Sequence, residues 1–257
     1  MSKPLILVCN DDGVTAPGIQ SLIESIRDLG DLIVVAPDKP QSGTGHGITL
    51  NATLRTQLIS QEEGLTVYSC SGTPVDCIKL AMYKLVPRKP DIIVSGINHG
   101  SNASINVLYS GTMSAAVEGA LEGVPSVGFS LLDHSIDADF SASREISRKI
   151  TKTVLAEGLP KNVCLNVNIP RLQRDEIMGI KICRQANGNW EEEFEQRLDP
   201  FGKEYFWLTG VFKNYDPGED TDIHALENNY VSVVPIQTDL TAHSALSSLK
   251  SWKLNEN

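Results

Sequence analysis

The sequence predicts an α/β fold: a Rossmann-like, three-layer α/β/α core with a mostly parallel sheet, followed by a C-terminal β-hairpin arm and a terminal helix. Continuous apolar runs at 5–9, 32–36 and 92–94, the last within an expected strand at 91–95, are typical of parallel strands buried on both faces. Amphipathic helical segments separate these runs, as βαβ crossovers require. Strand and helix stop alternating after residue 170. We therefore expect a core over 1–170 and an arm with a closing helix over 171–257, both in one structural unit.

Turn and capping residues delimit the elements of the first half. Pro17 suits the first turn of a helix that ends before Gly30, and Thr73 is a good N-cap for a helix stopped by Pro87. The loop 37–47 is too rich in proline and glycine to be a regular element. We expect, in order, a strand at 5–9, a helix at 17–29, strands at 32–36, 48–60 and 65–70, a helix at 73–85 and a strand at 91–95.

The second half continues this pattern and then departs from it. Ser110 or Thr112 is expected near the N-cap of a helix rich in small residues. We expect strands at 126–130 and 164–169, a helix at 141–157, short strands at 180–183, 205–208 and 230–234, and a closing helix at 242–252. Aromatic residues gather late in the chain, at Trp190, Phe194, Tyr205, Phe206 and Trp207. An arm with exposed aromatics favours an oligomer contact, and a lid or a small subdomain core are the alternatives.

Length and charge exclude several classes of protein. With 257 residues, 41% of them hydrophobic and 21% charged, the chain has an ordinary globular composition and can bury one full core. The net charge of −10 opposes a general grip on phosphate backbones, so we expect no stable nucleic-acid complex. The five cysteines contain no C-x-x-C pair, which indicates reduced thiols. Because no segment resembles a membrane span or a secretory signal, we expect a cytoplasmic protein without membrane contact.

Polar clusters follow three of the expected strands, at 10–13, 41–47 and 96–100. Because parallel strands end at one edge of the sheet, these clusters should meet there. Asp11 and Asp12 can face one site only if the chain turns, which Gly13 permits. Their carboxylates, with the hydroxyl of Ser42 and the amide oxygen of Asn98, form an all-oxygen set that suits Mg²⁺ or Mn²⁺. An Asx turn with two solvated acids is the alternative for the aspartate pair.

The helix start at Ser110-Gly111-Thr112 offers a cradle for an anion. Its unpaired N–H groups, two hydroxyls and the positive end of the helix dipole attract phosphate, and Gly43 could add a further N–H. A metal beside such a helix start suits the hydrolysis of a phosphomonoester. His46, His99 or water are the candidates for the general acid. The alternatives are a capped helix, turn residues and solvated histidines.

Five motifs stand in fixed order along residues 5 to about 130. They read I-L-V-x-N-D-D-G, A-P-x-x-x-Q-S-G-x-G-H, S-G-x-x-x-D-C, S-G-I-N-x-G-x-N and Y-S-G-T-M-x-A-A-x-E-G. Together they strongly resemble the SurE survival-protein family of 5′/3′-nucleotidases. Thr221-Asp222 and the segment 230–235 resemble the C-terminal signature of that family, whereas 133–219 matches it only loosely.

The resemblance implies a metal-dependent phosphatase that hydrolyses nucleoside 5′- or 3′-monophosphates, with a catalytic Rossmann-like core. It also implies a β-hairpin arm exchanged between the subunits of a homodimer or tetramer. The resemblance implies one divalent ion per subunit, Mg²⁺ or Mn²⁺. The family's metal ligands correspond to Asp11, Asp12, Ser42 and Asn98 here, with Asp11 and Asp12 as the catalytic pair. The family's phosphate contacts fall on Asn102, Ser110, Gly111 and Thr112, with Gly43 and Thr44 beside them. Whether Asp11 attacks phosphorus or orients a water is left open.

One loop departs from the family pattern. Many members carry a glycine and two acids before Tyr109, where this chain reads Ser104-Ile105-Asn106. The change puts in doubt any carboxylate role at this loop, and with it the substrate preference. Two other functions remain as alternatives on the same scaffold: a non-catalytic nucleotide-binding or regulatory protein, and a glycosyltransferase-like enzyme. The latter usually has a D-x-D at a strand end, which we do not find.

Overall fold

The computed structural model describes residues 3–252 and 254, and in this part of the chain the core is a nine-stranded sheet. Across the sheet the strands are β3 (Thr56–Glu62), β4 (Leu65–Cys70), β2 (Asp31–Pro37), β1 (Leu5–Cys9), β5 (Ile92–His99), β6 (Ser126–Leu131), β7 (Val163–Ile169), β11 (Tyr230–Gln237) and β8 (Gly179–Ile182). The pairs β3–β4 and β7–β11 are antiparallel and the others are parallel. The predicted mostly parallel α/β sheet is therefore confirmed.

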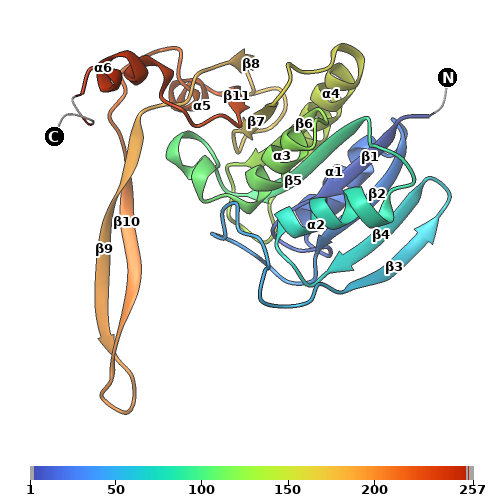
Figure 1. The fold of residues 1–257 in the computed structure, drawn as a ribbon, viewed down its shortest axis with the longest axis horizontal. Helices are drawn as coiled ribbons and strands as arrows, with labels where there is room; N and C mark the ends of the chain where they lie inside the picture. The colour runs from blue at the N-terminus through green and yellow to red at the C-terminus, as the bar shows by residue number, and fades with distance from the viewer. Residues whose placement is uncertain (1–2, 253, 255–257) are drawn as a thin grey trace.

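Helices cover both faces of this sheet (Figure 1). On one face, α1 (Pro17–Ile26) packs against α4 (Ser141–Glu157); on the other, α2 (Pro74–Leu80) packs against α3 (Gly111–Leu121). Shorter helical segments are η1 (Ala81–Leu85), η2 (Ser104–Leu108), α5 (Asp222–Glu227), η3 (His243–Ala245) and α6 (Leu246–Lys250). No helix in the described residues is long and apolar enough to cross a membrane. The three layers are those that the alternation of apolar runs and amphipathic segments predicts.

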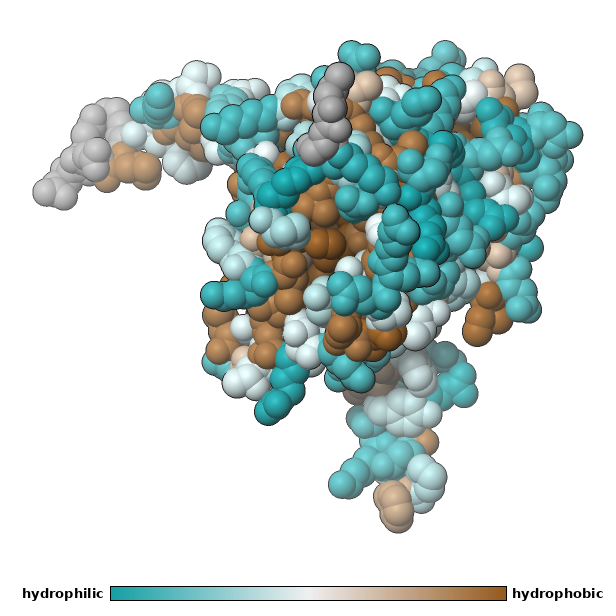
Figure 2. All heavy atoms as spheres, turned by 90° about the vertical axis from the view of Figure 1, so that its right-hand side faces the viewer, coloured by the Kyte–Doolittle hydropathy of each residue, from teal (hydrophilic) through white to brown (hydrophobic). Residues whose placement is uncertain are grey.

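A two-stranded antiparallel arm projects from this body. Its strands are β9 (Gly188–Leu198) and β10 (Glu204–Asn214), and Figures 1 and 2 show it extending away from the sheet. Large apolar side chains stand exposed along it, among them Phe194, Phe201 and Trp207, of which Phe201 is 88% exposed. The predicted hairpin is confirmed, and its aromatic surface is not covered by the rest of the described chain.

Several elements differ from the sequence-based expectation. Residues 48–55 form no strand: Thr49 is held by the buried carboxylate of Asp76, and Leu50 is exposed, so the apparent alternation faces no core. Strand β5 runs on to His99, because its last residues still pair with β6. Strand β10 is longer than expected, β9 was not expected as a strand, and the closing helix is two short pieces, η3 and α6. Residues 171–257 supply β8 and β11 to the main sheet as well as the arm.

Candidate active site

The Asp11-Asp12 pair lies at the carboxyl end of the central strand β1. Neighbours on the two sides of β1 are β2 and β5, so the strand order reverses here, at the position where open α/β sheets bind ligands. Asn10 donates from Nδ2 to the carbonyl of Gly13 over 2.9 Å, and Gly13 has a φ of +101°. This closed turn ends the strand. Because the chain turns here, the two adjacent carboxylates need not point to opposite faces of the sheet, as the sequence required.

Asp11 is buried against the start of α3. The hydroxyl of Thr112 donates to its Oδ1 over 2.6 Å, and a Cβ on Gly111 would lie 2.7 Å from the Cβ of Asp11. Burial raises the pKa of Asp11 to about 6, although the Thr112 hydroxyl lowers it, and the nearby charge of Asp12 adds to the increase. A glycine is needed at position 111 because any side chain there would displace the carboxylate.

Asp12 is half-buried beside the end of β5. The backbone N–H of His99 donates to its Oδ2 over 3.3 Å. Burial raises the pKa of Asp12 as well, and the contacts with His99 only partly offset that increase. In the described part of the chain, neither Asp11 nor Asp12 forms an ion pair with lysine or arginine. Two adjacent, desolvated carboxylates without a protein counter-charge fit a divalent cation.

The two neutral ligands proposed from sequence lie on the neighbouring segments. Asn98 stands near the end of β5, where its Nδ2 donates to the carbonyls of His99 and Gly100 over 3.2 and 2.8 Å. Because Nδ2 donates to these two carbonyls, the amide oxygen of Asn98 is the side-chain atom that could bind a cation. Ser42 is exposed on the loop after β2, and its neighbour Gln41 donates from its backbone N–H to the carbonyl of Asp11 over 2.8 Å. The same edge of the sheet therefore carries all four residues.

Only two of the four proposed metal ligands, Asp11 and Asp12, are acidic. No group of three or more His, Cys, Asp or Glu side chains that could hold a metal exists among the described residues. A metal at this edge would depend on two carboxylates, neutral oxygens and water. Mg²⁺ is commonly bound in this way, by one or two carboxylates together with water and substrate oxygens.

The predicted phosphate residues are partly engaged within the protein. Ser110 is the N-cap of α3, with its Oγ accepting from the N–H of Met113 over 3.0 Å, and Thr112 already donates to Asp11. Asn102 is buried, with its Nδ2 donating to the Oγ of Ser130 over 2.8 Å. Its backbone N–H and carbonyl are held by Asn168 and Asn166, respectively. Gly43 and Thr44 lie on the exposed loop beside Ser42, where the Thr44 hydroxyl donates to the carbonyl of Gln41 over 2.8 Å.

The two candidate histidines are held by different partners. His46 lies 2.9 Å from an oxygen of Glu118 on α3, whose other oxygen lies 2.5 Å from the ammonium of Lys79. Burial raises the pKa of Glu118, but the hydrogen bonds from His46 and Lys79 outweigh it and hold that pKa below its usual value. The ring of His99 packs edge-to-face on Phe140 at 5.2 Å. Within the described residues, neither imidazole ring hydrogen-bonds to the aspartate pair.

Three further residues around the site were not singled out for a role by sequence reasoning. Glu118 is buried and holds the loop that carries Ser42, through its contact with His46. Asp222 is fully buried and accepts the backbone N–H groups of Ser104 and Ala186 over 2.8 and 2.9 Å. Trp190, at the base of β9, donates from its indole nitrogen to Oδ1 of Asn106 over 2.7 Å. Their only sequence signal was membership in a motif, a C-terminal signature or an aromatic cluster.

Comparisons with known proteins identify the family of this chain. The family model described as "Survival protein SurE" matches residues 6–192. The chain is 61% identical over 256 residues to "5′-nucleotidase SurE" of Christiangramia forsetii, covering 99% of this chain and 98% of that protein. It is 58% identical to the protein of the same name from Flavobacterium psychrophilum, covering both chains fully.

A solved structure shows the same fold. The crystal structure of the SurE protein from Aquifex aeolicus superposes with a TM-score of 0.83 at 39% identity, covering 96% of this chain and 98% of that one. The motifs at the strand ends, the match over most of the chain and this structural likeness confirm the predicted resemblance. The chain belongs to the SurE family.

Proposed function

We propose that this protein is a divalent-metal-dependent hydrolase that converts nucleoside 5′- or 3′-monophosphates to nucleoside and phosphate. The observation that carries the proposal is the Asp11-Asp12 pair at the strand-order reversal, where Asp11 is buried and Asp12 half-buried and neither forms an ion pair with lysine or arginine in the described residues. The relatives described above are named 5′-nucleotidases, which supports the same reaction class. Activity on 3′-monophosphates is part of the proposal and rests on the family resemblance.

Asp11, Asp12, Asn98 and Ser42 would hold the metal, Mg²⁺ or Mn²⁺. When bound, that ion supplies positive charge that polarises a phosphoryl oxygen. The start of α3 would orient the phosphate, because its first N–H groups and its dipole favour negative charge. Thr112 keeps the Asp11 carboxylate in one orientation through its 2.6 Å hydrogen bond. Gly111 lets the substrate and Asp11 approach the helix start closely.

The remaining expectations are also part of this proposal. The protein would act in the cytoplasm on free nucleotides, without stable contact with nucleic acid. The aromatic arm of β9 and β10 would join subunits into a homodimer or tetramer, because its large apolar side chains are exposed in a single chain. His46, His99 or water would protonate the leaving alkoxide.

A substrate panel with added metals tests the proposed function. The purified protein, stripped with EDTA, should release no phosphate from nucleoside monophosphates, and Mn²⁺ or Mg²⁺ should restore release. Asp12→Asn should lose nearly all turnover while its circular dichroism spectrum stays unchanged. Metal-independent turnover, or an active Asp12→Asn protein, would refute the mechanism. Tight nucleotide binding without phosphate release would favour the rival, a non-catalytic nucleotide-binding protein.

A further inference from the structure

A cavity of about 520 Å³ lies between the site and the base of the arm. Its lining residues are Gly43, Tyr109, Trp190, Leu208, Thr209 and Gly210. We propose that this cavity binds the nucleobase of the substrate, with the base stacked on the indole of Trp190. The inference rests on the proposed function, since it names the subsite for the part of the nucleotide that the metal and phosphate groups do not contact.

One wall of the cavity is built from the chain neighbours of the proposed catalytic residues. Gly43 follows the proposed ligand Ser42, and Tyr109 precedes the phosphate cradle that begins at Ser110. The two segments are joined, because the N–H of Gly45 donates to the carbonyl of Tyr109 over 3.2 Å. A monophosphate held at the start of α3 therefore has this cavity beside it for its nucleoside.

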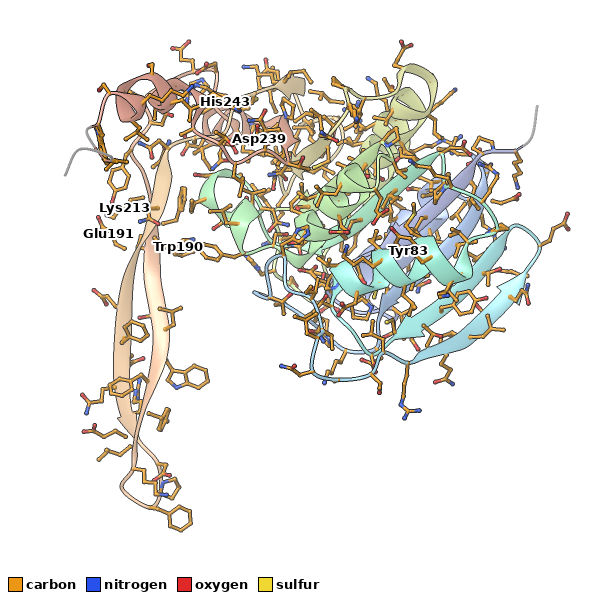
Figure 3. All side chains as sticks on the ribbon, in the orientation of Figure 1. Tyr83, Trp190, Glu191, Lys213, Asp239 and His243 are labelled. Carbon is orange, nitrogen blue, oxygen red and sulfur yellow. The ribbon has the colours of Figure 1, made fainter. Side chains whose placement is uncertain are left out.

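The opposite wall presents a fixed aromatic ring. Trp190 stands at the base of β9, on the side of the arm that faces the body (Figure 3). Its indole nitrogen donates to Asn106 over 2.7 Å, and its ring packs edge-to-face on Phe212 at 5.9 Å and 69°. Trp190 is 38% exposed, so it keeps a free surface although two contacts set the orientation of its ring. A ring held in this way provides a stacking platform without further loss of side-chain entropy.

The chemistry of the lining selects a neutral, planar ligand group. None of the six lining residues is charged, so the cavity offers no charged side chain to a second phosphate. The hydroxyl of Thr209 already donates to the carbonyl of Glu193 over 3.1 Å, which leaves few groups for reading base edges. Stacking is tolerant of base identity because every base has a π-face. We therefore expect broad base specificity, with purines preferred over pyrimidines by their larger stacking area.

The test compares a substrate that has a base with one that lacks it. We would measure kcat/KM for adenosine 5′-monophosphate and for ribose 5-phosphate with added Mn²⁺, in the wild type, Trp190→Ala and Trp190→Phe. Trp190→Ala should lower kcat/KM for the nucleotide about 10- to 100-fold, mainly through KM, and change that for ribose 5-phosphate less than about 2-fold. Trp190→Phe keeps a stacking ring and should retain most activity. Tyr83→Ala, which removes an exposed aromatic side chain of η1 outside the arm and outside the cavity lining, is the control and should behave as the wild type.

Equal loss on both substrates in Trp190→Ala, or no loss on either, would overturn the base subsite and leave the proposed function intact. Absence of all phosphate release in the wild type would instead refute the proposed function. Calorimetric titration with adenosine, which has no phosphate, still decides the base subsite in that case. Binding that weakens at least about 10-fold in Trp190→Ala supports the subsite. Adenosine that does not bind the wild type, or binds both proteins equally, overturns it.

Discussion

Asp11→Asn should change thermal stability in opposite directions in the absence and in the presence of metal. Burial raises the pKa of Asp11 from 3.8 to about 6. The folded, metal-free protein therefore binds this proton more tightly than the unfolded chain does. Above about pH 6 the ionised Asp11 lowers the free energy of unfolding of the metal-free protein. Below about pH 4 Asp11 is protonated in both the folded and the unfolded state, and this destabilisation disappears. A bound cation reverses the sign, because it is attracted to the ionised form.

The size of the effect follows from the pKa difference. About two pKa units correspond to about 3 kcal/mol when fully expressed. Between about pH 4.5 and about pH 8, the metal-free wild type should lose about 2 kcal/mol of unfolding free energy relative to Asp11→Asn. For a chain of this length, that is about 4 °C in Tm. Any fixed cost of the buried amide in Asp11→Asn cancels in the comparison of the two pH values.

Thermal unfolding of both proteins in EDTA, and again with excess Mn²⁺, provides the measurement. Metal at about 100 times its Kd should add about 2.7 kcal/mol to the wild type and much less to Asp11→Asn. Asp175→Asn, which changes an exposed acid of the same type, serves as the control for the loss of one negative charge. Parallel pH profiles in EDTA would show that Asp11 is not desolvated as described. Equal stabilisation of both proteins by metal would remove Asp11 from the ligand set.

Two further substitutions test the surroundings of the site. Gly111→Ala places a methyl group 2.7 Å from the Cβ of Asp11 and so must displace that carboxylate. We expect kcat/KM for a nucleoside monophosphate to fall about 100-fold, and a wild-type value would contradict the described packing. Glu118→Gln weakens the contacts with His46 and Lys79. Urea unfolding near pH 7 should show a loss of about 1–2 kcal/mol, and an unchanged midpoint would mean that these contacts contribute nothing.

The position of the site could be predicted from sequence because it depends on the order and direction of the strands and not on individual side-chain contacts. Buried parallel strands read as continuous apolar runs, and their carboxyl ends must share one edge of the sheet. Asp11 and Asn98 are far apart in the chain, yet β1 and β5 pair directly, with Cys9 opposite Ser95. The residues that follow those strands are therefore neighbours. No side-chain detail is needed to reach this conclusion.

The arm could not be delimited from sequence, for a related reason. Hydrophobic periodicity reports burial, and β9 packs against no core in this chain. In its sequence, G-N-W-E-E-E-F-E-Q-R-L, the apolar residues recur only at every fourth position, and Phe194 and Leu198 are exposed. Only β10 carried a strand signal, over part of its length. Residues 48–55 show the converse error. Their apolar alternation suggested a strand, but hydrogen bonds to Asp76 hold this segment in an irregular path.

The contribution of α3 to the site depends on long-range contacts that no spacing rule reveals. Gly111 and Thr112, at its first turn, fix the Asp11 carboxylate at the end of β1. About two turns later the same helix presents Glu118, which anchors His46 and with it the loop that carries Ser42. One rigid element thus positions both the aspartates and the neutral hydroxyl. The family motif that contains these residues is therefore explained by packing at both ends of α3, as well as by the anion-binding capacity of its first turn.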